Sequence, residues 1–282
     1  MAKVDLHIHT TASDGRFSPT EIVHKAAEQG LVFIAIADHD TVDGIAPALN
    51  AAKAFLGLKV IPAVEVSTDI PHGEVHILGY FIDYTDHNLL ITLERMRNSR
   101  RERARRMVTK LGDLGVHISW ERVQEIAGSG SVGRPHIAQA MLEKDYIDTF
   151  NEAFNKYISR DGPAYVEREK MTPQEAIELI LQTQGLPVLA HPFTIPDPET
   201  MIIELKTAGL VGIEAYYNGF SIDEVNKLVG LADKYNLIAS GGSDYHGLND
   251  DAETTIGGVD VPVESAERLI ALAEQRAQKL ML

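Results

Sequence analysis

The chain contains no cysteine among its 282 residues. Disulfide bonds and thiolate metal sites are therefore excluded, so any bound metal ion must be held by nitrogen and oxygen ligands. Because nothing in such a chain depends on an oxidising compartment, we expect a cytoplasmic protein.

A basic surplus and long apolar runs are also missing. The formal net charge is -15, which argues against wrapping of nucleic acid by the whole surface, and we expect no stable binding to duplex DNA. From Met1 the chain enters the alternating residues Val4, Leu6 and Ile8 directly, without a basic leader or a long apolar stretch. We therefore expect neither a signal peptide nor a membrane partner.

The chain does contain enough apolar sequence for a substantial core. Hydrophobic residues make up 44% of it, and short β-branched runs alternate with longer amphipathic stretches, a pattern typical of β/α units around a parallel sheet. The segments 18–21 and 172–175 each combine a cap residue, a proline and an acid, as at the start of a helix. We expect strands at residues 3–9, 32–37, 59–66, 75–81, 186–190, 211–216 and 237–241.

Histidines and carboxylates gather where these strands are expected to end. The motifs are DLHIHT, ADHD, AVEVS, EVHILGY, LAHP and GGSDYHG. A β/α barrel builds its active face from the carboxyl ends of its strands, so we expect these segments to converge. This amount of imidazole and carboxylate would suit a hydrolytic site with two or three metal ions.

The alternation stops between Phe81 and Thr172, where the composition is mostly helical. We expect helices at residues 88–112, 119–127, 134–144 and 149–157. Because β/α units lie on both sides, we interpret residues 88–164 as a helical insertion that caps the substrate site. Residues 1–87 and 165–282 would then form the metal-binding barrel.

The segment from Asp5 to His9 carries the strongest chemical signal. Alternate residues of a strand share a face, and two imidazoles on one face can bind a single ion, although such a pair is also found on partly exposed strands. Glu65 and Asp244 would be costly to bury at other strand ends without a cation, which favours the metal site. Strict alternation places Asp5, His7 and His9 inward, and Val4, Leu6 and Ile8 outward against helices.

These motifs resemble those of the PHP (polymerase and histidinol phosphatase) family, specifically its stand-alone nucleotide phosphatase branch. The resemblance lies in DLHIHTTASDG, IAIADHDTVDG, AVEVS, HILGY, LAHP and GSDYH. It implies an α/β fold, a distorted (β/α)7 barrel of PHP type with a helical insertion, and two to three divalent ions, manganese, iron or zinc. It implies a first metal on His7, His9, Glu65 and Asp244, a second on His76 and His191 with Glu65 bridging, and a third on Asp14, His39 and His246.

Some of these residues have simpler interpretations when taken alone. His76 lies in an apolar run, where a hydrogen-bonded core histidine is more common than a ligand. Asp38 and Asp40 would either orient imidazole groups or form a turn and a helix cap, and the cap is the favoured interpretation for Asp40.

A glycine-rich loop at residues 128–133 leads into the segment GRPHIA. The free N–H groups at a helix start, with Arg134 and His136 as further donors, would suit a phosphate, although an ordinary loop before a proline-started helix has the same pattern. GRPHIA resembles the phosphate-contacting segment of the family branch, and Lys170 resembles a position with the same role.

Basic residues are concentrated at 95–110, in one expected helix. They are either a solvated helix face, the more common case, or a basic lid that attracts nucleotides or single-stranded RNA ends.

Closely spaced divalent cations would hydrolyse phosphate esters without a covalent nucleophile. We expect direct attack by a metal-bound hydroxide held by Glu65, His191 and Asp244. The predicted protein is a metal-dependent phosphoesterase that removes a terminal phosphate from nucleoside mono- or bisphosphates and extends to 5'-3' action on short RNA. The alternatives are a histidinol-phosphate phosphatase and a non-catalytic, metal-stabilised PHP module that binds a partner protein.

Overall fold

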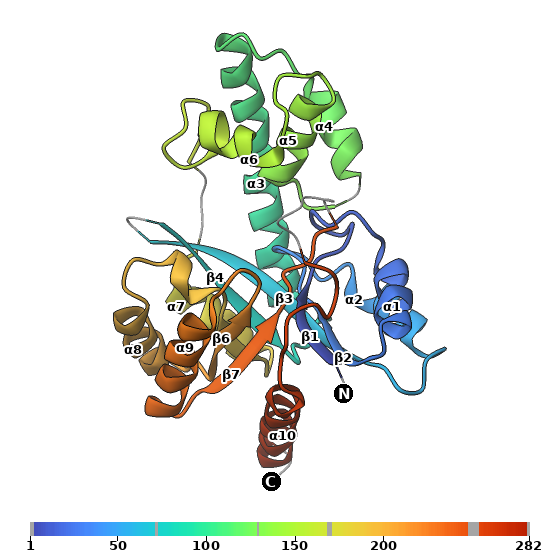
Figure 1. The fold of residues 1–282 in the computed structure, drawn as a ribbon, viewed down its shortest axis with the longest axis vertical. Coiled ribbons are helices and arrows are strands. Elements are labelled where there is room, and N and C mark those ends of the chain that lie inside the picture. The colour runs from blue at the N-terminus through green and yellow to red at the C-terminus, as the bar shows by residue number, and fades with distance from the viewer. Residues whose placement is uncertain (1–2, 71–72, 129, 168–170, 248–253, 281–282) are drawn as a thin grey trace.

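The computed structural model describes residues 3–70, 73–128, 130–167, 171–247 and 254–280. Its centre is a seven-stranded sheet in the order β1 to β7, curved into a nearly closed barrel (Figure 1). A bridge between Ile8 and Tyr245 brings the segment after β7 beside β1. The expected α/β barrel is confirmed. The strands are β1 (Lys3–Ile8), β2 (Leu31–Ile36), β3 (Lys59–Ile70), β4 (Gly73–Tyr80), β5 (Leu186–Leu189), β6 (Gly212–Tyr217) and β7 (Ile238–Gly242).

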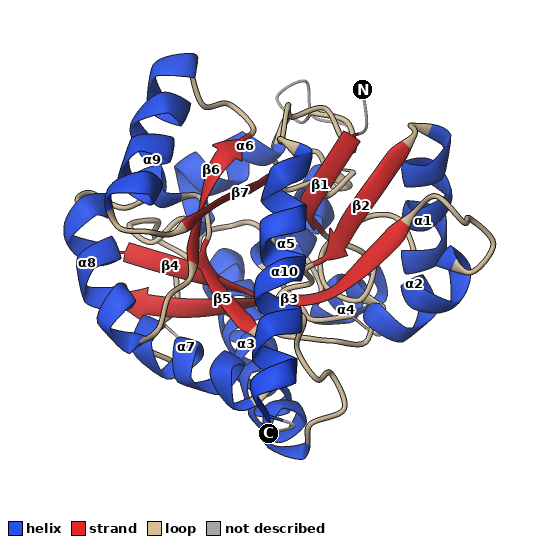
Figure 2. Cartoon of the chain, turned by 90° about the horizontal axis from the view of Figure 1, so that it is seen from below, coloured by secondary structure: helices blue, strands red, loops and turns tan. Residues whose placement is uncertain are grey.

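Helices cover the outside of this barrel. Two start as the sequence predicts, because Ser18 with Glu21 and Thr172 with Glu175 form reciprocal capping boxes. The last helix, α10 (Val263–Leu280), lies across the end of the barrel (Figure 2). The covering helices are α1 (Pro19–Glu28), α2 (Ile45–Ala52), α7 (Pro173–Gln182), α8 (Pro198–Ala208) and α9 (Ile222–Lys234).

The expectation of a parallel sheet is wrong for β4. This strand pairs antiparallel with both β3 and β5, while the remaining neighbours are parallel. Only two residues separate the end of β3 from the start of β4, and so short a connection cannot cross over to a parallel strand. β3 also continues four residues beyond the expected end, to Ile70, and the hairpin brings His76 opposite Ser67.

Strict alternation along β1 is also wrong. Val4 and Leu6 belong to the core cluster that contains Leu269 of α10, whereas Ile8 packs with Ile22 of α1. The register of β1 against β2 shifts between Asp5 and Ile8. Such a bulge changes the face to which the following side chains point, so the apolar residues of β1 divide between two cores.

A group of helices lies between β4 and α7 in the chain and sits over one end of the barrel (Figure 1). Its apolar residues from Ala104 to Val166 form a core cluster separate from those of the barrel. The domain boundaries at residues 88 and 164 stay a prediction. The helices are α3 (His87–Asp113), α4 (Trp120–Ala127), α5 (Arg134–Leu142) and α6 (Phe150–Ala153), followed by a π-helical turn at Phe154–Ile158. We call them the helical unit.

Within the described residues, no helix has both the length and the apolar composition needed to cross a bilayer.

Candidate metal centre

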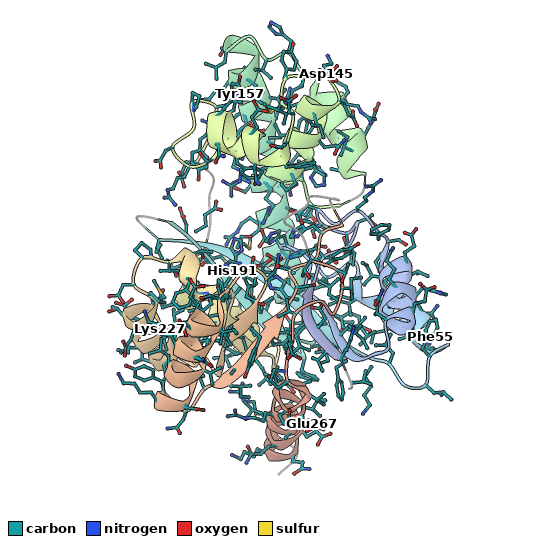
Figure 3. The ribbon with its side chains drawn as sticks, viewed as in Figure 1. Phe55, Asp145, Tyr157, His191, Lys227 and Glu267 are labelled. Carbon is teal, nitrogen blue, oxygen red and sulfur yellow. The ribbon has the colours of Figure 1, made fainter. Side chains whose placement is uncertain are left out.

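The histidine and carboxylate motifs meet at the end of the barrel that faces the helical unit. Figure 3 shows His191 at this junction, below the helices. Each side chain comes from a strand or from the loop that follows it, as a β/α barrel arranges its active face. They are His7 and His9 at the end of β1, Asp14 after it, His39 after β2, Glu65 on β3, His76 on β4, His191 after β5, and Asp244 and His246 after β7.

Glu65 is the centre of this cluster and is buried. Both of its oxygens face imidazole nitrogens, and no other carboxylate of the described cluster reaches as many rings. This is the position expected of a carboxylate that bridges two metal ions. Its Oε2 lies 2.9 Å from His39 Nδ1 and 3.3 Å from the Nε2 atoms of His7 and His9, and its Oε1 lies 2.8 Å from His76 Nδ1 and 3.2 Å from His191 Nε2.

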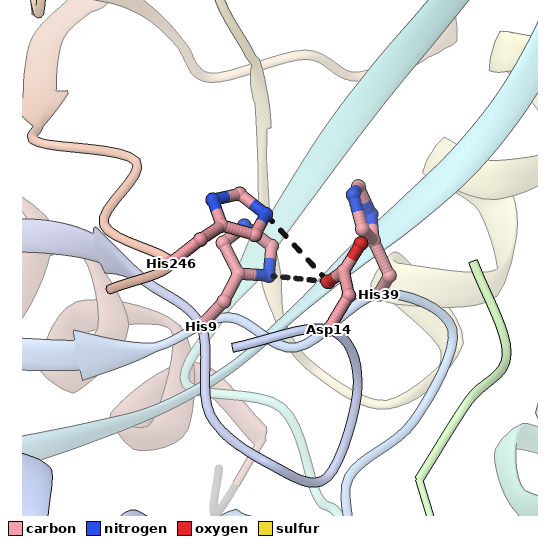
Figure 4. A group of neighbouring side chains, drawn as sticks. All are labelled: His9, Asp14, His39 and His246. Atoms are coloured by element: carbon pink, nitrogen blue, oxygen red, sulfur yellow. Dashed lines mark ion pairs between the residues drawn. The ribbon is translucent and has the colours of Figure 1, made fainter. Parts of the chain in front are cut away.

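Three sets of side chains are close enough to share an ion. The sets are His7, His9, Glu65 and Asp244; His39, Glu65 and His76; and His9, Asp14, His39 and His246. The first contains the four residues that the resemblance implied for one metal. The second adds His39 to Glu65 and His76. His191 lies 3.2 Å from the same Glu65 Oε1 that His76 Nδ1 approaches at 2.8 Å, which is compatible with the pair of His76 and His191 that the resemblance implied. Figure 4 shows the third set, in which Asp14 Oδ1 lies 3.8 Å from His9 Nδ1 and 3.6 Å from His246 Nε2.

The donor set fits divalent cations. The Nε2 atoms of His7 and His9 lie 3.2 Å apart. Three buried atoms of the cluster, Asp14 Oδ1, His39 Nδ1 and Glu65 Oε2, have no hydrogen-bond partner among the described residues. Buried polar atoms are normally satisfied, so a cluster of lone pairs aimed at one another indicates ions between them. Mixed nitrogen and oxygen donors suit transition metals such as manganese, iron or zinc.

Electrostatics within the cluster favour ionised carboxylates. Burial would raise the pKa of Glu65, but imidazoles around it, among them His76 and His7, hold that pKa well below its usual range. Burial lowers the pKa of His39 to about 4, although the nearby Glu65 carboxylate acts to raise it. His39 therefore stays neutral and keeps a lone pair available for a cation.

The side chains around the ligands fix their orientation. Glu214 on β6 is buried, with Oε1 2.9 Å from His7 Nδ1, and its Oε2 accepts a 2.8 Å bond from the backbone N–H of His191. The hydroxyl of Tyr217 donates to Asp244 Oδ2 at 2.7 Å. Sequence reasoning missed both residues, although Glu214 interrupts an apolar strand as Glu65 does, and that signal was available.

The favoured interpretation of Asp40 as a helix cap is wrong. The N-cap of α2 is Gly44, and Asp40 accepts bonds from the backbone N–H of Ser67 at 2.8 Å and from Arg100 Nε at 2.5 Å. Asp38 likewise forms no hydrogen bond or ion pair with an imidazole of the described residues. It accepts from Thr10 and from Ser13 Oγ, and that hydroxyl lies 3.4 Å from His9 Nδ1.

A hollow of about 180 Å³ opens from the cluster toward the helical unit, and we call it the metal-side hollow. Its wall carries Arg100, Arg103, Arg134 and Phe154 beside His39 and His76, among other residues. Arg134 lies over the Phe154 ring, 5.5 Å from its centroid, and donates to Glu74 Oε2 at 2.5 Å. Cations and an aromatic ring therefore face the metal ligands across one small space.

The three residues expected to contact phosphate have different placements. Arg134 lines the metal-side hollow. The buried His136 uses Nδ1 to accept the backbone N–H of Gly133 at 2.9 Å, and burial lowers its pKa. Lys170 lies outside the described residues.

The basic residues of α3 divide between two faces of the helix, and their role as a lid that attracts nucleotides stays a prediction. Arg100 and Arg103 are buried and line the metal-side hollow, whereas Arg101, Arg105 and Arg106 are exposed. The signal for this division is the spacing of the buried residues of α3, since both arginines fall in the apolar series. That series is Leu89, Leu93, Met96, Arg100, Arg103, Met107 and Leu111.

Comparison with known proteins finds relatives along nearly the whole chain. The family model described as the PHP domain matches residues 5–160. A 3',5'-nucleoside bisphosphate phosphatase from Chromobacterium violaceum is 32% identical over 251 residues, which cover 87% of this chain and 88% of that protein. A 5'-3' exoribonuclease from Haemophilus influenzae is 34% identical over 248 residues, which cover 86% of this chain and 90% of that protein.

Solved structures share the architecture. A protein from Bifidobacterium adolescentis, described as a metal-dependent phosphoesterase, superimposes with a TM-score of 0.87 at 26% identity, over 96% of each chain. A Chromobacterium violaceum structure, described as an amidohydrolase with bound sulfate and no metal, has a TM-score of 0.88 at 31% identity, also over 96% of each chain. Both likenesses cover the barrel and the helical unit together.

Proposed function

The chain belongs to the PHP domain family and is a metal-dependent phosphoesterase, and we propose that its substrates are nucleotides. It removes a terminal phosphate from nucleoside mono- or bisphosphates and extends this hydrolysis to the 5' end of short RNA. The observation that carries the proposal is the metal-side hollow, where three arginines and a phenylalanine face the ligand cluster. A phosphate with an attached nucleoside requires that pairing of positive charge with an aromatic surface.

The chain's own side chains supply the frame for the reaction. Divalent cations held by the nine clustered ligands would neutralise phosphate oxygens and lower the pKa of a bound water. Glu214 and Tyr217 keep His7 and Asp244 in place, so the ligands need not reorganise when substrate enters. Arg134, on the rim of the hollow, is placed to pair with a phosphate that is not being cleaved.

The relatives' names support the substrate class. One is named for 3',5'-nucleoside bisphosphates and another for 5'-3' exoribonuclease action, so a nucleotide phosphate is common to both. A related structure holds sulfate, which has the shape and charge of a phosphate group. We infer that this chain recognises the same chemical group.

The test is a screen of the manganese-supplemented enzyme for phosphate or nucleotide release. The substrates are mononucleotides, nucleoside 3',5'-bisphosphates, histidinol phosphate and 5'-phosphorylated short RNA. We expect nucleotides and RNA to be hydrolysed and histidinol phosphate to be spared. Hydrolysis of histidinol phosphate alone would contradict our proposal and favour a histidinol-phosphate phosphatase. A protein that hydrolyses none of these substrates would favour the non-catalytic PHP module. His39→Ala and Asp244→Ala are the matched inactive controls, because each removes a cluster ligand.

A further inference from the structure

A second hollow, of about 360 Å³, adjoins the metal-side hollow and shares Asp14 and Pro135 with it. We call it the outer hollow. It lies between the loop after β1 and the helical unit, and Arg16, Ile126, Gln139 and Phe150 are among its lining residues. Its volume falls in the range of small-molecule sites, which is about 300 to 1,000 Å³.

The barrel-side wall of the outer hollow is fixed to the metal centre. The backbone N–H of Arg16 donates to the carbonyl of His246 at 2.7 Å, and the N–H of Gly15 donates to Thr10 at 2.9 Å. A Cβ at Gly15 would lie 2.6 Å from the His9 carbonyl oxygen, so only glycine allows this close turn. The loop therefore holds Arg16 at a set position relative to the ligands.

The outer hollow is lined by two arginines and two carboxylates, Asp14 and Glu143, so what matters is which of the arginines is paired. Arg122 and Glu143 neutralise each other through two bonds, of 2.8 and 2.9 Å. Arg16 is exposed, and within the described residues no carboxylate forms an ion pair with it. An anion that enters the hollow would thus meet an uncommitted guanidinium.

The helical wall offers an apolar surface beside that cation. Ile126 of α4 and Phe150 of α6 are only partly buried and pack against the core of the helical unit. A phenyl ring and an aliphatic side chain next to a guanidinium form the combination that binds single-stranded nucleic acid, since each base has a face to stack and a phosphate to pair.

Two hollows that meet at a metal ligand suit a phosphodiester better than a monoester, because a diester carries an organic group on each side of phosphorus. We propose that the outer hollow binds the second nucleotide of a 5'-phosphorylated RNA, an inference that rests on the proposed function. The base of this nucleotide lies against Phe150 and Ile126, and the phosphate on its 3' side lies at Arg16. The first nucleotide occupies the metal-side hollow.

The bond chemistry is the same for both substrates. The oxygen of water joins phosphorus, the bond from phosphorus to the 3'-oxygen of the first nucleotide breaks, and that oxygen receives a proton. With RNA, the phosphate stays on the second nucleotide. With a nucleoside 3',5'-bisphosphate, it leaves as inorganic phosphate and the outer hollow takes no part.

Variants of the outer hollow should therefore separate the two reactions. Arg16→Ala and Phe150→Ala should each lower kcat/KM for a 5'-phosphorylated tetraribonucleotide about tenfold, the loss expected for one stacked or paired group. Turnover of a nucleoside 3',5'-bisphosphate should stay unchanged. Arg106→Ala, an exposed arginine on α3, is the charge-matched control for both substrates. Phe150→Leu keeps the apolar volume and removes the ring, which covers the case in which the alanine variant does not fold.

Binding gives a readout independent of turnover. Fluorescence anisotropy with a phosphorothioate tetraribonucleotide should show the same tenfold weakening in the Arg16 and Phe150 variants, and none in the control. Equal losses on both substrates, or an unaffected RNA, would overturn the second-nucleotide site. A wild-type enzyme that hydrolyses bisphosphates but no RNA would overturn this site alone, whereas failure on every nucleotide would overturn the proposed function as well.

Discussion

At the scale of single residues, the carboxylate of Glu214 acts on the metal centre without joining it. It bonds the ring of His7 and the backbone of His191, which approach from different strands. Glu214→Gln keeps the size of the side chain but removes its charge, so His7 loses the partner that fixes its ring and raises its basicity. We expect manganese affinity to fall about 10-fold to 100-fold, as is usual for such outer partners.

Isothermal titration of chelator-treated protein with manganese measures this affinity. Glu199→Gln, at an acid of α8 that pairs with Lys234 and belongs to no ligand set, is the matched control and should bind manganese as the parent does. Equal affinities for the parent and for Glu214→Gln would remove Glu214 from any role at the centre.

Arg134 has a separate role, in substrate binding. Its guanidinium lines the metal-side hollow and contacts no cluster ligand through a hydrogen bond or ion pair in the described residues. Arg134→Ala should raise KM for nucleoside bisphosphates about tenfold or more, with kcat less affected. The reason is that the bond between Arg134 and a phosphate that is not cleaved stabilises the bound substrate and the transition state equally. Steady-state kinetics measure both parameters, with Arg122→Ala as the control that should keep the KM of the parent. If Arg134→Ala also keeps the KM of the parent, Arg134 does not bind the substrate.

The sequence was sufficient to identify the cluster residues but not how they associate. Motifs at strand ends indicate convergence, because topology alone places those ends together. The grouping of His39 with Glu65 and His76 depends on the antiparallel β4, which has no clear sequence signal here. Tyr217 was missed because it belongs to no motif and is recognised only by its contact with Asp244. Glu214 was missed although its position within an apolar strand was a signal in the sequence.

At the scale of elements, α3 links the barrel to the helical unit through a buried ion pair. Arg100 lies in the apolar stripe of the helix, and its Nε donates to the buried carboxylate of Asp40. From composition alone, all the arginines of this helix are equivalent, since a charge count carries no information about which face is buried. The helical period separates them once the core is known.

Loss of this ion pair should destabilise the fold. Arg100→Met preserves the length of the side chain but leaves the Asp40 carboxylate buried without its guanidinium, and removing one partner of such a pair costs about 3 to 5 kcal/mol. Arg105→Met, on the exposed face of the same helix, should change the free energy of unfolding by less than about 0.5 kcal/mol. Urea denaturation followed by circular dichroism compares the two variants, and equal stabilities would mean that the pair contributes nothing net.

At the scale of the whole molecule, the metal centre joins all parts of the barrel. Its ligands come from β1, β3 and β4 and from the segments after β1, β2, β5 and β7, so an ion held there connects both halves of the sheet. Without ions, carboxylates and imidazoles with unsatisfied atoms are confined to one buried space. That arrangement is stable only because the surrounding cores compensate for its cost, as active sites commonly require.

Metal binding should therefore raise the stability of the entire fold. An ion that binds only the folded state adds about 2.7 kcal/mol at a hundredfold excess over its dissociation constant, which for a chain of this size is a rise in Tm on the order of 5 °C. Differential scanning fluorimetry of chelator-treated protein, with and without manganese, measures it. Asp244→Ala removes a ligand shared with His7 and His9 and should reduce the rise. Asp260→Ala, at an exposed acid that belongs to none of the three ligand sets, should keep it in full. If manganese shifts the Tm of Asp244→Ala as much as that of the parent, the ion binds elsewhere and the assignment of the centre fails.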